Sequence, residues 1–155
     1  MKLTTRGRYA LIALMELAEQ GSTMPITLAA IADRQNLSVS YLEYLFRRLK
    51  LNHLVRSVRG PGGGYTLADS PSRISIARVV LAVDNSLLDI DINTDEHQES
   101  FTSFLDHRLW HGIHQKLYEY LDNITLYDLL KECNRTASVV HFNSLKLSPL
   151  MRCAV

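Results

Sequence analysis

The chain of 155 residues contains only two cysteines, Cys133 and Cys153, and no pair with CxxC spacing. Two thiols cannot supply the four ligands of a thiolate-bound metal site within one chain. No apolar run approaches the roughly 20 residues that a membrane-spanning helix needs. Residues 1–21 are too polar and too helically periodic for a secretory signal. We therefore expect a cytoplasmic protein with no membrane span.

The sequence also lacks a nucleophile–base pair in a recognisable setting, which argues against an enzyme and against a small-molecule substrate. Its charge, in contrast, is distributed unevenly. The net charge is +1, but residues 1–73 hold ten Lys/Arg and five Asp/Glu, a local charge of +5. Residues 74–155 carry −4. A basic half of this kind is typical of a protein that binds a polyanion.

Apolar residues at helical spacing predict three helices in the basic half. The first ends near Gly21, the second begins after a capping Thr27, and the third follows a polar break at residues 36–38. Two short helices joined by such a turn form a helix-turn-helix. The inward positions are Leu11, Leu14, Met15 and Ala18, then Leu28, Ile31 and Ala32, then Leu42, Leu45, Phe46 and Leu49.

A glycine-rich connection follows between two stretches with the composition of strands, residues 54–59 and 65–68. Such a tight turn predicts a β-hairpin, and a hairpin directly after a helix-turn-helix is a wing. The phosphate loop of an ATPase would need a Lys-Ser/Thr pair and a following helix, which are absent here. The predicted fold class is mainly α, a winged helix-turn-helix with a two-stranded wing and a long C-terminal dimerisation helix. The wing turn consists of Gly60, Pro61, Gly62, Gly63 and Gly64.

The second half is less regular. A fourth helix follows a Ser75 cap, with Ile76, Val79, Val80 and Val83 inward. Residues 84–106 then hold seven acidic residues and no Lys or Arg, which indicates an exposed loop. The predicted organisation is a DNA-binding domain at 1–83, an acidic flexible loop at 84–104, a dimerisation helix with a short following helix at 105–133, and a flexible tail at 134–155.

The dimerisation helix is predicted from about Ser103 to Asn123. At about 1.5 Å per residue it spans roughly 30 Å, more than so small a domain can cover. Its apolar stripe therefore predicts a helix–helix interface in a homodimer, with packing against its own domain as the alternative. Thr125 and Asp128 resemble a capping box that opens the short helix. The stripe consists of Leu105, Leu109, Ile113, Leu117, Tyr120, Leu121 and Ile124.

The third helix carries the candidate DNA-reading residues. The N-terminal end of a recognition helix enters the major groove and presents polar or small side chains there. Serine can bond base edges or phosphates, and glutamate can accept from a cytosine amine. One exposed Ser or Tyr at a helix start is more commonly a cap or a surface residue. The prediction of DNA contacts therefore rests on several such residues that share the free face of one helix. The candidates are Ser38, Ser40, Tyr41, Glu43 and Tyr44.

Basic residues supply the expected phosphate contacts. Such contacts position a protein on DNA without reading its sequence. Arg59 stands apart, because an arginine at the wing tip can enter a narrow minor groove; a solvated hairpin arginine is the alternative. The other cations are Arg47, Arg48, Lys50 and Arg56.

The strings LTTRGRYALIALMELA and LSVSYLEYLFRRLKLNHLVRSVRGPGGGYTLA resemble the IscR-like iron–sulfur cluster regulators of the Rrf2 family of bacterial winged-helix repressors. The resemblance covers roughly residues 1–131 and is most specific at SYLE and RGPGGGY. It implies a homodimer on palindromic promoter DNA. Tyr44 departs from the pattern, because relatives often carry Gln, an adenine reader, at this place. The DNA contacts that the resemblance implies are Ser38, Ser40, Tyr41, Glu43 and Arg59.

IscR-like proteins hold a [2Fe–2S] cluster with three cysteines and a histidine located before the long helix. Here the corresponding loop contains no cysteine, and only His107 matches the histidine. One imidazole cannot replace three thiolates, so we expect no cofactor. With the i, i+4, i+7 spacing of His107, His111 and His114, a zinc or Fe(II) site is the weaker alternative to a solvated polar face.

The sequence therefore predicts a cluster-free transcription regulator, repressor or activator, that binds double-stranded DNA as a homodimer. The expected targets are promoters of iron–sulfur cluster assembly or related stress genes. Two alternatives are a metal- or redox-responsive regulator that uses the histidines and a winged-helix module controlled by a protein partner.

Overall fold

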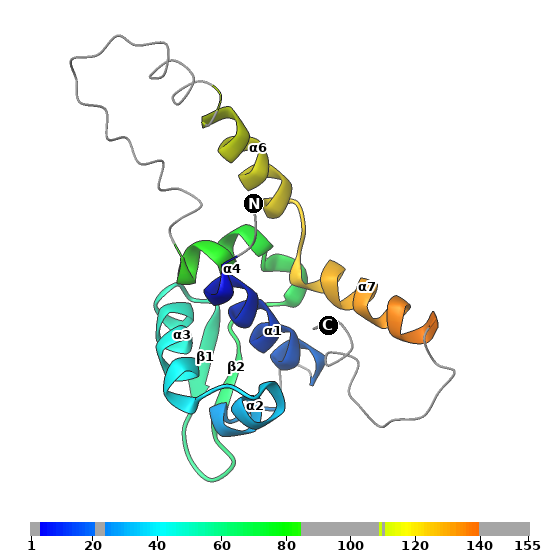
Figure 1. The fold of residues 1–155 in the computed structure, drawn as a ribbon. Helices are drawn as coiled ribbons and strands as arrows, with labels where there is room; N and C mark the ends of the chain where they lie inside the picture. The colour runs from blue at the N-terminus through cyan, green and yellow to red at the C-terminus, as the bar shows by residue number, and fades with distance from the viewer. Residues whose placement is uncertain (1–3, 21–23, 85–108, 110, 140–155) are drawn as a thin grey trace, which may run out of the picture.

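The computed structural model describes residues 4–20, 24–84, 109 and 111–139. In these residues the elements follow the predicted order, and α6 extends away from the others (Figure 1). No described helix is long and apolar enough to cross a bilayer. The elements are α1 (Thr5–Glu19), α2 (Leu28–Gln35), α3 (Val39–Leu51), β1 (Val55–Val58), β2 (Gly64–Leu67), the 3₁₀ turn η1 (Pro71–Arg73), α4 (Ile76–Val83), α6 (His111–Asp122) and α7 (Leu126–Val139).

A hydroxyl side chain caps the start of each helix from α1 to α4. Thr4, Thr27, Ser38 and Ser75 each accept a hydrogen bond from the backbone N–H three residues later, at 3.2 to 3.4 Å. Each cap satisfies a backbone donor that has no partner within the helix. The predicted caps at Thr27 and Ser75 are therefore confirmed. Asn36 ends α2 in the left-handed conformation, with a φ of 52°, which asparagine adopts more readily than most residues.

The apolar stripes of the helices meet in one core. On α3, the four residues predicted to face inward are all 0% exposed, namely Leu42, Leu45, Phe46 and Leu49. Burial of a side chain of this size stabilises the fold by about 1.5–3 kcal/mol. The core therefore fixes the orientation of α3 about its own axis, and the opposite face of the helix points outward.

The wing is an antiparallel hairpin in which Val55 pairs with Leu67 and Val58 pairs with Gly64. The second strand begins one residue before its predicted start, because Gly64 already pairs with β1. The hairpin was predicted from residues 54–59 and 65–68, so its existence is confirmed and its ends are adjusted.

A third segment, just before α2, supports the hairpin. Ile26 and Tyr65 exchange two backbone hydrogen bonds of 3.0 and 2.8 Å. The Tyr65 ring also packs against the ring of Phe46 in α3, with 4.9 Å between the centroids. The wing is thus attached both to the segment before α2 and to α3.

The second half joins the winged domain at the start of α4. The Ile76 N–H donates to the Ile124 carbonyl at 2.9 Å. The Ser75 hydroxyl donates to Asp122 Oδ1 at 2.6 Å while it accepts the capping hydrogen bond described above. One serine therefore both caps α4 and binds the end of α6.

The predicted capping box opens α7. The Asp128 N–H donates to Thr125 Oγ1 at 3.2 Å, and the Thr125 N–H donates to Asp128 Oδ2 at 2.9 Å. The prediction of a flexible tail from residue 134 is corrected over its first residues, because α7 continues to Val139. No Gly or Pro interrupts residues 126–139, so nothing local ends the helix earlier. Residues 85–108, with most of the predicted acidic loop, and residues 140–155 lie outside the described residues.

Candidate nucleic-acid interface

The outward face of α3 consists of polar and charged side chains at the predicted positions. Ser40, Glu43, Tyr44 and Arg47 are exposed, whereas the opposite face is buried in the core. The wing hairpin lies next to α3 (Figure 1). A helix with one face free and a hairpin at its side has the geometry of a winged helix-turn-helix that enters a major groove.

Two of the predicted reading residues, Ser38 and Tyr41, also have structural roles. Ser38 Oγ accepts from the Tyr41 N–H at 3.2 Å, which leaves its hydroxyl proton for a base or a phosphate. The Tyr41 ring meets Tyr9 of α1 edge-to-face, with 6.1 Å between centroids and 88° between planes. Burial raises the pKa of Tyr41, and the positive charge of Arg6 opposes this shift. Tyr41 therefore stays a neutral phenol held in place by α1.

Tyr44 is paired with an arginine one helical turn further on. Arg48 Nη1 donates to the Tyr44 hydroxyl at 3.0 Å, and the guanidinium carbon lies 6.0 Å from the ring centroid. This hydrogen bond lowers the pKa of Tyr44, and the charges of Arg48 and Arg6 act in the same direction. Because the hydroxyl accepts from Arg48, its own proton is directed elsewhere and can be donated to a phosphate oxygen or a purine nitrogen.

The predicted phosphate-binding cations fall into two groups. Lys50 Nζ donates to Ser57 Oγ at 2.8 Å, and Arg56 donates to a backbone carbonyl just after β2, so both hold the hairpin in place. Arg47 and Arg59 are exposed and form no ion pair within the described residues. An arginine without a carboxylate partner can present its planar group of N–H donors to a phosphate.

The wing glycines are required for two different reasons. Gly60 and Gly62 have φ values of +108° and +75°, where side chains other than glycine are strained. At Gly63 an added Cβ would lie 2.5 Å from a carbonyl oxygen of β1, and at Gly64 it would lie 2.3 Å from the carbonyl oxygen of Ile26. The bare turn therefore lets the backbone segments approach closely next to Arg59.

A buried carboxylate that sequence reasoning missed connects α1 to α2. Glu16 is 4% exposed, its Oε1 accepts from Gln35 Nε2, and its Oε2 lies 3.2 Å from Arg34 Nε. The Arg34 Nε–H donates to the Ala30 carbonyl at 3.1 Å, so Glu16 Oε2 has no hydrogen-bond donor among the residues that the structure describes. Burial raises the pKa of Glu16, although Gln35 and Arg34 act to lower it. This cluster fixes α2, the first helix of the helix-turn-helix, on α1.

The weak metal candidate, His107, lies outside the described residues, and so does the side chain of His111. Within the part of the chain that the structure describes, no three His, Cys, Asp or Glu side chains are arranged to hold a metal ion. The histidine cluster therefore stays a prediction.

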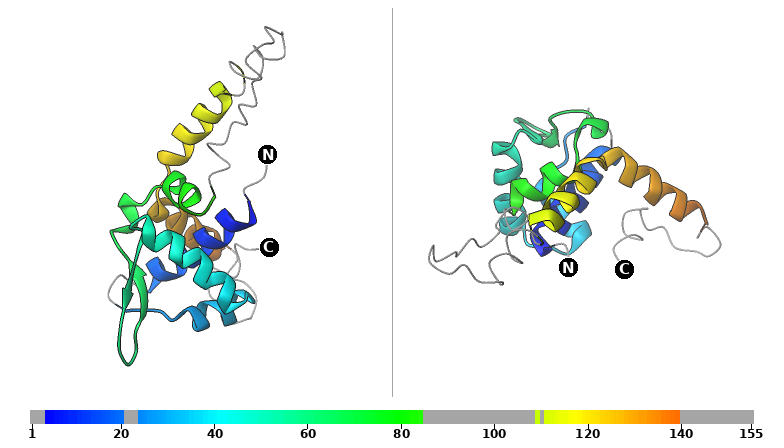
Figure 2. Two further views of the ribbon diagram at one scale, coloured as in Figure 1. Left: turned by 90° about the vertical axis from the view of Figure 1, so that its left-hand side faces the viewer. Right: turned by 90° about the horizontal axis from the view of Figure 1, so that it is seen from above.

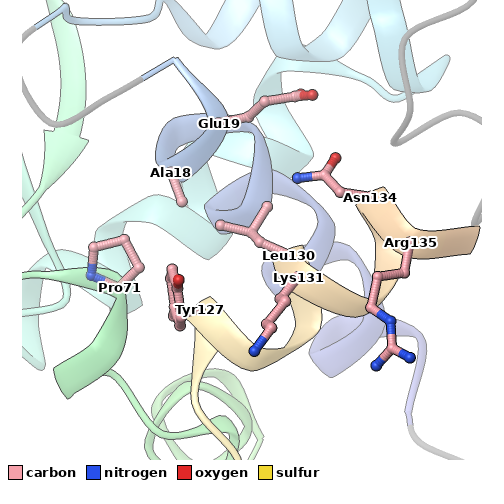
Figure 3. A pocket seen from close by; sticks show the side chains of 8 residues that line it. All are labelled: Ala18, Glu19, Pro71, Tyr127, Leu130, Lys131, Asn134 and Arg135. Atoms are coloured by element: carbon pink, nitrogen blue, oxygen red, sulfur yellow. The ribbon is translucent and has the colours of Figure 1, made fainter. Parts of the chain in front are cut away.

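A pocket of about 520 Å³ lies between the end of α1, η1 and α7 (Figure 3). Pro71, Tyr127 and Leu130 give it an apolar wall, and Lys131 and Arg135 line its α7 side. Figures 1 and 2 show α7 and α3 on opposite sides of α1. The pocket is therefore separate from the face formed by α3 and the wing.

Known proteins share this architecture and sequence. Residues 3–132 match the Rrf2 family, described as iron-dependent transcriptional regulators. The chain belongs to the Rrf2 family. The HTH-type transcriptional regulator IscR of Yersinia pseudotuberculosis is 42% identical to this Rrf2 protein over 130 residues, which cover 84% of the chain and 79% of IscR.

Solved structures of Rrf2-type regulators agree with the fold. IscR of T. potens is similar with a TM-score of 0.70 and 33% identity, over 94% of each chain. CymR, the global cysteine regulator of B. subtilis, is similar with a TM-score of 0.70 and 33% identity, over 85% of this chain and 98% of CymR. The predicted winged-helix fold and the resemblance to IscR-like regulators are confirmed.

The relatives also decide the class of function. They are named transcriptional regulators, and this Rrf2 protein is accordingly a DNA-binding transcription regulator, as the sequence predicted. The prediction that it is no enzyme is confirmed by the same relatives.

Proposed function

We propose that this Rrf2 regulator binds palindromic promoter DNA as a homodimer, with α3 in the major groove and the wing at the adjacent minor groove. The main support for the proposal is the exposed polar face of α3, which lies opposite four fully buried apolar residues of the same helix. Arg47 then meets the phosphate backbone, and Arg59 enters the minor groove. The proposed base-reading residues are Ser38, Ser40, Tyr41 and Glu43, and Tyr44 is a further proposed DNA contact on the same face.

The exposed apolar face of α6 supports the homodimer. Ile113 and Tyr120 are 41% and 65% exposed, and Leu109 just before the helix is 53% exposed. Leu121 and Ile124, at the other end of the predicted stripe, pack against the core. Apolar side chains gathered on one extended helix mark an interaction site. A second α6 related by two-fold symmetry would cover them and would match a palindromic DNA site.

We further propose that the regulator works without an iron–sulfur cluster. Such clusters are held chiefly by cysteine thiolates, and residues 84–110 contain none. Cys133 lies on α7 and is only 6% exposed. The donor set of this chain therefore does not fit a centre with three thiolates before the long helix. The proposed targets, promoters of iron–sulfur cluster assembly or related stress genes, follow from the resemblance to IscR, and the proposed location is the cytoplasm, on nucleoid DNA.

An electrophoretic mobility shift with an IscR-type palindrome at moderate salt tests the proposal. The wild type should retard the palindrome and not a scrambled duplex of equal length. Arg59→Ala should weaken binding about fivefold or more, because a specific arginine contact contributes about 1–3 kcal/mol. Arg135→Ala is the matched control, since Arg135 lies on the α7 side of the domain. Absence of specific retardation, or equal affinities of the two variants, would count against the proposed mode of binding.

A further inference from the structure

The first turn of α1 lies beside the recognition helix. The rings of Tyr9 and Tyr41 are in edge-to-face contact, with 6.1 Å between their centroids. Arg6 precedes Tyr9 by three residues in α1, and residues three apart share one face of a helix. Arg6 therefore lies on the face of α1 that is turned toward α3.

The charge of Arg6 reaches the exposed hydroxyls of α3. The positive charge of its guanidinium acts to lower the pKa of both the Tyr41 and the Tyr44 hydroxyl. Tyr44 also accepts a hydrogen bond from Arg48. Two arginines from two helices thus act on one exposed phenol. Arg6 itself is exposed and forms no ion pair within the described residues.

The first turn of α1 does not compensate the charge of Arg6. The N-terminus of a helix carries a partial positive charge, so acidic side chains are favourable there and basic ones are not. The first turn of α1 contains no acidic residue and does contain Arg6. The positive charge of Arg6 therefore destabilises the N-terminus of α1 when no anion is bound. A negatively charged partner at this end of the helix would make the interaction favourable.

We propose that Arg6, together with Arg48 and the hydroxyl of Tyr44, binds one backbone phosphate of the DNA strand that borders the groove entered by α3. The proposal rests on the proposed DNA-binding mode above. A phosphodiester offers two charged acceptor oxygens, which match guanidinium donors and one phenolic O–H. Because the ligand is the backbone, the contact positions α3 without reading the sequence.

Fluorescence anisotropy titrations against a series of salt concentrations test this contact on two duplexes, the palindrome and an unrelated sequence. Arg6→Ala should lower the slope of log affinity against log salt by about 0.9 for each bound protomer. If the salt lines converge at 1 M, affinity at 0.1 M salt falls about eightfold per contact on both duplexes. Arg6→Lys should keep the salt slope of the wild type. Tyr44→Phe should lower the affinity and leave the salt slope unchanged. Arg135→Ala should change neither the affinity nor the salt slope.

The outcomes separate this contact from the DNA-binding mode as a whole. If the wild type binds neither duplex, both proposals fail. If the wild type binds specifically and Arg6→Ala keeps its affinity and salt slope, the phosphate contact alone is refuted. Loss of binding on the palindrome with an unchanged slope on the unrelated duplex would also overturn it, because Arg6 would then read bases. Circular dichroism of each variant, with Arg6→Lys as the conservative case, shows that the fold is kept.

Discussion

Replacement of Gly64 by alanine tests how the wing is held to the rest of the domain. A Cβ at this position would lie 2.3 Å from the carbonyl oxygen of Ile26 and 2.5 Å from its carbonyl carbon. Both are backbone atoms, so no side-chain rotation relieves the clash, and β2 must move away from the segment before α2. This movement disrupts the two hydrogen bonds of 2.8 and 3.0 Å between Ile26 and Tyr65.

The expected magnitude follows from these contacts. Each of the two hydrogen bonds contributes about 0.5–1.5 kcal/mol, and overpacking costs about 1–3 kcal/mol. We expect Gly64→Ala to lower the free energy of unfolding by about 3 kcal/mol. The control is Gly62→Ala, where an added Cβ meets nothing within 4 Å but φ is +75°. Its left-handed backbone costs about 1–2 kcal/mol, partly offset by a less flexible unfolded chain.

Urea unfolding followed by far-ultraviolet circular dichroism measures both variants. Gly64→Ala should unfold at a clearly lower urea concentration than Gly62→Ala, although the two positions belong to one turn. Equal losses, or a smaller loss at Gly64, would refute the close approach of the wing to Ile26 as the reason for glycine there.

Two further predictions concern α1 and α6. Burial raises the pKa of the Glu16 carboxyl above its ordinary value of 4.5. The folded protein therefore binds the carboxyl proton more tightly than the unfolded chain does. As the pH rises from 4.5 through the raised pKa, Glu16 ionises and the folded state loses stability. In urea unfolding, the free energy of unfolding of Glu16→Gln minus that of the wild type should therefore increase between pH 4.5 and pH 7.5. A difference that stays constant over this range would contradict the prediction. Ile113→Asp should convert a dimer into a monomer in light scattering, whereas Gln115→Asp, also exposed on α6, should not; two dimeric variants would exclude the proposed interface.

Local patterns predicted the parts of the fold that depend on neighbours in sequence. The i, i+3, i+4, i+7 spacing located the buried face of α3, since Leu42, Leu45, Phe46 and Leu49 are all fully buried. Short hydroxyl side chains that can bond an N–H three residues later predicted the caps, as Thr27 and Ser75 show. The exposed face of α3, which is the candidate DNA-binding face, could be predicted from the same spacing, because the polar residues lie outside the buried stripe.

Contacts between distant segments could not be predicted in the same way. The bridge between Ile26 and Tyr65 has no periodic signal, because a single residue before α2 takes part. Glu16 meets Gln35 only when α1 packs on α2. Arg6 was missed for the same reason, since only the contact between Tyr9 and Tyr41 brings the start of α1 to the recognition helix.

The positions of these contacts bear on the proposal that the regulator works without an iron–sulfur cluster. The wing is held to α3 and α2 by Tyr65 on Phe46, by Lys50 on Ser57 and by the Ile26 bridge, all within residues 26–67. α6 instead meets the domain at the start of α4, where Ser75 binds Asp122. Each of these wing contacts is made between residues that precede residue 85 in the sequence. The absence of cysteines from residues 85–108 is therefore compatible with the observed arrangement of α3 and the wing.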